Sequence, residues 1–135
     1  MKDKIPHQAL VVVADGTGAR MFRNSGHGNK VSLTVDGELK PSNLLNDGPA
    51  GKRPTESSAQ EIDEATFAKQ LANELYRRAH SGNFAALVLI ADPQTLGQIR
   101  PSLHQEVKDR LVVELDKTLT HAALDEIEKA LTATS

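Results

Sequence analysis

The chain has 135 residues, enough for one domain whose core needs no covalent cross-link. It contains no cysteine, which excludes disulfides, thiol catalysis and cysteine-bound metals and fits a reducing cytosol. Its net charge of −2 argues against indiscriminate binding to nucleic acid. The N-terminus lacks the apolar stretch of a signal peptide, and no run reaches the roughly 20 apolar residues that span a membrane. We therefore predict a single cytoplasmic domain over residues 1–135.

The first third of the chain predicts three antiparallel strands. Residues 9–15 form an apolar run that ends in an Asp-Gly turn, and residues 19–24 and 31–35 then alternate as strands do. We expect Asp36-Gly37 to end the third strand. Because residues 31–35 form an exposed outer edge, and such edges pair with other chains, we predict a homodimer through this strand.

Residues 40–58 are rich in proline, glycine, asparagine and serine and cannot build a core element. A loop this long inside a compact domain is uncommon and is usually either functional or mobile. Its basic residues could contact phosphate or an acidic surface, whereas a solvated, mobile loop is the structural alternative. His27, in a glycine-flanked turn, is the one histidine that we expect to be exposed. The candidate binding residues are thus Lys40, Lys52, Arg53 and His27.

The middle of the chain predicts a helix and then a buried strand. Ser58-Ala59-Gln60-Glu61 is a capping box, and the helix that it opens has one apolar stripe between Ala65 and Ala79. Residues 84–93 form a second unbroken apolar run, closed by Asp92-Pro93. That pair is typical of a helix start, with the aspartate as N-cap and the proline in the first turn.

The last third predicts a strand over residues 111–115 and a final helix capped by Thr120. The element order is then β-β-β-α-β-α-β-α. Strands that are apolar on both faces need cover on both faces, and crossovers between parallel strands are right-handed. These rules give an α/β fold with a mixed five-stranded sheet ordered 3-2-1-4-5, helices on both faces and the two apolar runs as parallel neighbours. This is the ribonuclease H-like arrangement. The final helix should point three apolar side chains inward: Leu124, Ile127 and Leu131.

Aspartates follow three of the predicted core strands, at Asp15, Asp92 and Asp116. Acidic side chains at the strand ends of such a sheet can hold two divalent cations for phosphodiester cleavage, so a metal-dependent nuclease is one hypothesis. Turn, helix-cap and strand-end roles are the structural alternative, which we favour because residues 10–14 contain no acid. The five histidines lack the spacing of a metal site, and we predict no metal and no cofactor.

Five segments of the chain carry a resemblance to a known family: residues 11–16, 47–53, 67–72, 87–97 and 116–120. They resemble the bacterial host attachment protein family, whose name refers to a requirement for attachment to host cells. That family in turn resembles the central domain of archaeal and eukaryotic peptide-release factors, which has the strand order inferred above. In those factors a Gly-Gly-Gln tip on the loop after the third strand enters the peptidyl-transferase centre; the corresponding residues 40–58 contain no such tip.

The leading functional hypothesis is a non-enzymatic bacterial binding protein. The resemblance implies docking on the ribosome, on RNA or on a protein partner, and the basic residues of the 40–58 loop are the contact that we predict. Two alternatives stay open from the sequence. One is the nuclease that uses the strand-end aspartates, and the other is an adhesion factor, as the name of the resembling family suggests.

Overall fold

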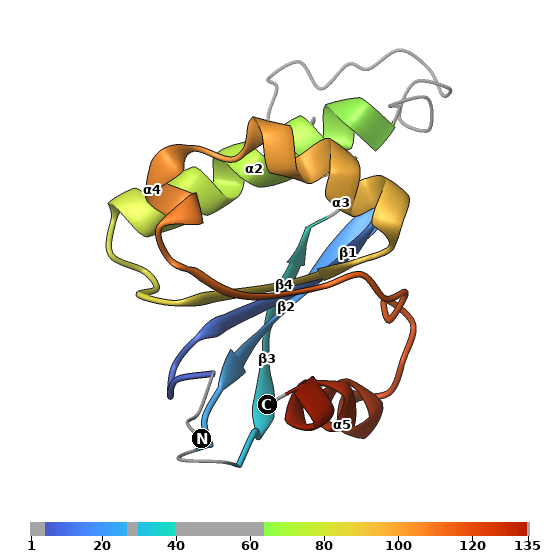
Figure 1. Cartoon of the computed structure of the whole chain (residues 1–135). Helices are drawn as coiled ribbons and strands as arrows, with labels where there is room; N and C mark the ends of the chain where they lie inside the picture. Colours follow the sequence, from blue (N-terminus) through green and yellow to red (C-terminus); the bar gives the residue numbers. More distant parts are fainter. Residues whose placement is uncertain (1–4, 27–29, 40–63, 135) are drawn as a thin grey trace, which may run out of the picture.

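The computed structural model describes residues 5–26, 30–39 and 64–134 (Figure 1). Among these residues, no helix is both long and apolar enough to cross a membrane. In chain order the elements are β1 (Leu10–Asp15), β2 (Gly18–Asn24), β3 (Leu33–Leu39), α2 (Glu64–His80), β4 (Leu87–Ala91), α3 (Pro93–Ile99), the 3₁₀ helix η2 (Arg100–Ser102), α4 (Gln105–Lys108), β5 (Leu111–Leu115) and α5 (Leu124–Thr134).

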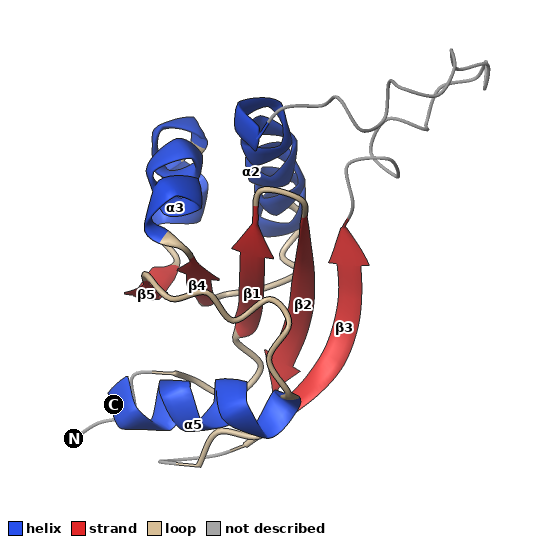
Figure 2. Ribbon diagram, turned by 90° about the vertical axis from the view of Figure 1, so that its right-hand side faces the viewer, coloured by secondary structure: helices blue, strands red, loops and turns tan. Residues whose placement is uncertain are grey.

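The five strands form one mixed sheet in the order β3-β2-β1-β4-β5 (Figure 2). The β1–β2 and β2–β3 pairs are antiparallel, and the β1–β4 and β4–β5 pairs are parallel. The predicted sheet order and the parallel pairing of the two apolar runs are therefore confirmed. The ribonuclease H-like label stays a prediction.

Helices cover both faces of the sheet, as expected for strands that are apolar on both sides. Figure 1 shows α2, α3 and α4 on one face and α5 on the other. Successive residues of a strand point to opposite faces, so Leu10 and Val12 pack on the α2 side while Val11 and Val13 pack on the α5 side. All four side chains are fully buried, which places β1 at the centre of both core clusters.

Strand β3 runs past Asp36-Gly37, where we expected it to end. Phe22 pairs with Val35 and Met21 pairs with Gly37, so Asp36 is an extra residue that forms a β-bulge. The carboxylate of Asp36 lies 3.5 Å from Arg23 Nε on β2 and 3.4 Å from a guanidinium nitrogen of Arg78 on α2. The Asp-Gly pair that usually marks a turn is here held inside a strand by these two arginines.

The final helix begins at Leu124, and Thr120 does not cap it. Ile127 and Leu131 are fully buried against the sheet and Leu124 is half-buried, so their predicted inward orientation is confirmed. The side chain of Thr120 points instead to the end of β1. Residues 116–123 thus form a connection that is tied to the sheet before the helix starts.

Candidate functional site

The three predicted aspartates lie where the parallel strands β1, β4 and β5 reach their carboxyl ends. Asp15 is the last residue of β1, Asp92 directly follows β4, and Asp116 directly follows β5. Because these strands are parallel, their carboxyl ends share the edge at which α/β sheets commonly bind ligands. The position of the three residues relative to the sheet is therefore as predicted.

Asp15 is held by three hydrogen bonds from two threonines. One carboxylate oxygen accepts from the backbone N–H of Thr17 at 2.7 Å and from its hydroxyl at 2.8 Å. The other accepts from the hydroxyl of Thr120 at 2.8 Å. Partial burial by itself would raise the pKa of Asp15, but these hydrogen bonds and the charge of His121 outweigh it and hold the pKa below its usual value.

The other two aspartates have different surroundings. Asp92 is the N-cap of α3 and accepts the backbone N–H of Thr95 at 3.1 Å, with Pro93 in the first turn. Asp116 is exposed to solvent. Within residues 5–26, 30–39 and 64–134, no group of three or more histidine, aspartate or glutamate side chains could hold a metal ion. The local roles expected of Asp15 and Asp92, in a turn and in a helix cap, are the ones that the structure contains.

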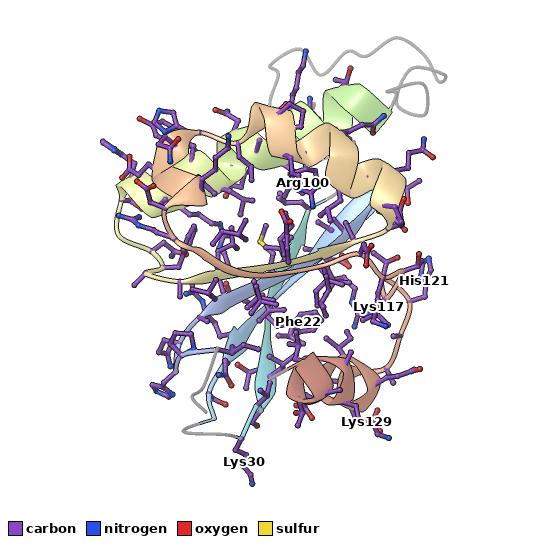
Figure 3. All side chains as sticks on the ribbon, viewed as in Figure 1. Phe22, Lys30, Arg100, Lys117, His121 and Lys129 are labelled. Carbon is purple, nitrogen blue, oxygen red and sulfur yellow. The ribbon has the colours of Figure 1, made fainter. Side chains whose placement is uncertain are left out.

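Arg20 on β2 forms hydrogen bonds with the connection between β5 and α5. One guanidinium nitrogen donates to the backbone carbonyl oxygens of Thr120 and Ala122, each at 3.0 Å. The same guanidinium lies 5.0 Å from the centre of the Phe22 ring, on the α5 side of the sheet (Figure 3). Sequence reasoning missed this residue, because its partners are about a hundred positions away and no local pattern connects them.

A pocket of about 390 Å³ opens beside this network. Both signs of charge face it: Asp15 and Glu38 supply carboxylates, while Arg20 and His121 supply basic groups. Figure 3 shows His121 and Lys117 on the connection that leads to α5. Leu39, the last described residue of β3, also lines the pocket, so residues 40–58 leave the described part of the fold at this point.

The candidate binding residues Lys40, Lys52, Arg53 and His27 all lie outside the described residues. The expectation that only one histidine would be exposed is wrong. Four other histidines are exposed on the described surface: His7, His80, His104 and His121. Two of them, His80 and His104, lie next to Tyr76 on α2. Tyr76 and His104 also line a second pocket that sequence reasoning did not find.

The sheet order β3-β2-β1-β4-β5 and the helices on both faces define a protein of the mixed α/β class. Residues 8–131 match the family model described as bacterial archaeo-eukaryotic release factor family 12, and the chain belongs to this family. None of the curated proteins compared with the chain matches it. The inferred kinship with release factors is confirmed, whereas the link to host attachment stays a prediction.

Proposed function

We propose that the protein is a non-enzymatic, cytoplasmic binding protein that docks on the ribosome through residues 40–58. Membership of a release-factor-related family is the observation that carries the proposal, because the matched range contains this segment. Lys40, Lys52 and Arg53 supply positive charge for ribosomal RNA phosphates, and His27 is an additional contact. Residues 40–58 contain no glutamine, so the proposed activity is docking and not peptide release.

The described residues support this choice of segment. The segment starts after Leu39, at the sheet edge that carries Asp15, and the described chain resumes at Glu64 in α2. A binding segment attached at the ends of a β-strand and a helix is anchored on rigid elements.

Ribosome co-sedimentation tests the proposal. The full chain should pellet with bacterial ribosomes at low salt, and Lys52→Ala/Arg53→Ala should weaken binding and lower the slope of log affinity against log salt by about two. Lys30→Ala/Lys129→Ala is the matched control, since it removes two exposed charges on the α5 side (Figure 3). The proposal fails if the wild-type chain does not pellet at low salt, or if the control loses as much binding as the loop variant.

A further inference from the structure

The second pocket lies on the face of α2 that is turned toward the η2–α4 segment. It measures about 310 Å³ and is formed between α2 and the η2–α4 segment. Its lining residues are Lys69, Ala72, Asn73, Tyr76, Ser102 and His104. In contrast to the pocket beside Asp15, no carboxylate is among the described residues that line it, and Lys69 is its one formal charge. The pocket therefore suits an anionic ligand.

A partly exposed aromatic stack forms one side of this pocket. The rings of Tyr76 and His104 are stacked, with 4.2 Å between their centroids and 29° between their planes. The ring of His80, one helical turn after Tyr76, is 5.6 Å from the tyrosine ring on α2. The chain has one tyrosine and no tryptophan, and its three phenylalanines are all buried. The one tyrosine of the sequence thus lines this pocket, where it also packs against the border of the core.

Two carboxylates on the elements that form this pocket are each paired with basic side chains. Glu106, which lies 3.4 Å from His80, also lies 3.7 Å from Arg110. Glu74 lies on α2 and is paired with Arg77 and Arg78 of the same helix. Both carboxylates therefore have cationic neighbours, so they oppose an incoming anion less than isolated carboxylates would.

We propose that this pocket binds an unpaired RNA nucleotide, whose base stacks on the Tyr76–His104 pair while its phosphate contacts Lys69. Aromatic rings beside a basic side chain are the recurring means by which proteins hold single-stranded nucleic acid. The amide of Asn73 and the hydroxyl of Ser102 provide hydrogen-bonding groups for the base edge or the ribose. The inference deepens the proposed ribosome binding, because it adds a contact with RNA that described residues of α2 and the η2–α4 segment make.

The experiment measures binding of the full chain to a fluorescent single-stranded RNA of about ten nucleotides, by anisotropy. His104→Asn removes the ring but keeps an N-cap for α4, which His104 supplies by accepting the N–H of Glu106. Tyr76→Leu removes the aromatic ring and keeps apolar bulk. Each variant should bind about fivefold to a hundredfold more weakly, the loss of one stacking contact.

A matched pair of lysine variants tests the phosphate contact. Lys69→Gln should lower the slope of log affinity against log salt by about 0.7, the value for one phosphate on a single strand. Lys129→Gln removes the same charge from α5, on the opposite face of the sheet, and should leave both affinity and slope unchanged (Figure 3). Thermal unfolding shows whether each variant is folded. If Tyr76→Leu is unfolded, the RNA affinity of His104→Asn alone tests the stacking contact.

The outcomes separate this inference from the proposed function. RNA binding that is absent in the wild type, or equal in wild type and His104→Asn, overturns the nucleotide pocket. If ribosome pelleting still depends on Lys52 and Arg53 in that case, the proposed function survives alone. If His104→Asn weakens ribosome pelleting while the oligonucleotide never binds, the pocket contacts a ribosomal protein and the RNA inference is wrong.

Discussion

The hydroxyl of Thr120 donates a hydrogen bond of 2.8 Å to a carboxylate oxygen of Asp15, across 105 positions of sequence. This bond joins the end of the central strand β1 to the connection that leads into α5. The backbone carbonyl of Thr120 also accepts from Arg20, so one residue links β1, β2 and the final helix. The candidate site at the carboxyl ends of the parallel strands therefore depends on contacts that are made only in the folded chain.

Replacing Thr120 should destabilise the fold. Thr120 is 7% exposed, and Thr120→Val keeps its shape while removing the donor to Asp15. We expect the free energy of unfolding to fall by about 1.5–3 kcal/mol, the usual range for a hydrogen bond to a charged acceptor. Urea denaturation measures this. Thr118→Val, at an exposed position of the same connection, should change the stability little, and equal losses in both variants would contradict the role of Thr120.

The low pKa of Asp15 predicts a pH dependence of stability. The carboxylate form is favoured in the folded state, so the unfolded chain binds the proton more readily. The stabilisation is thus fully present above the unfolded pKa of about 3.9 and is lost as the pH falls through the lower folded pKa. Asp15→Asn should remove this part of the acid sensitivity and lower the stability at neutral pH.

Urea titrations at neutral pH and between about pH 4 and pH 2 measure the effect of Asp15→Asn. Asp116→Asn is the matched control, because Asp116 is an exposed aspartate at the same edge of the sheet. The control should show the acid sensitivity of the wild type. If both variants gave the same pH profile, Asp15 would not be the group responsible.

Arg20 should be irreplaceable by lysine. One guanidinium nitrogen donates to two carbonyl oxygens while the planar group lies against the Phe22 ring, and a lysine ammonium has no planar face for that ring. We expect Arg20→Lys to speed amide hydrogen exchange in residues 116–123, most visibly at Ala122, whose N–H donates to Leu119. Arg77→Lys, at a 64% exposed arginine on α2, should leave that exchange unchanged. Faster exchange throughout the chain would point to global destabilisation instead.

Edge strand β3 is the surface through which we predict a homodimer. Val35 on β3 is 73% exposed, and β3 pairs with β2 alone in the described sheet. We expect the wild-type chain to dimerise and Val35→Lys to be monomeric in analytical ultracentrifugation, because a charge on an edge strand opposes pairing. Val112→Lys, on the opposite edge strand β5, should still dimerise. A wild-type chain that stays monomeric at high concentration would exclude the dimer.

Local patterns predicted the parts of the fold that depend on neighbouring residues. The apolar runs of β1 and β4 required cover on both faces, and this requirement, with the handedness of crossovers, was enough for the sheet order. Asp92-Pro93 predicted a helix start because capping involves residues three positions apart. These features are determined within one element or by general rules of chain connection.

Features that depend on distant partners could not be predicted. The bulge at Asp36 requires Arg23 and Arg78, and the role of Thr120 requires Asp15. The stack of Tyr76 on His104 joins two helices whose register the sequence does not reveal. At Asp36 and Thr120 a local signal, a turn pair and a capping hydroxyl, was overridden by a partner that only the tertiary fold brings near.

The position of α5 in the chain has a consequence for synthesis. Among the described helices, α5 alone covers its face of the sheet, and residues 124–134 follow all five strands. During synthesis all five strands therefore precede the helix that covers Val11, Val13 and Val88. A sheet that pairs before α5 has been made exposes this apolar face, and exposed apolar surface on an incomplete chain favours aggregation.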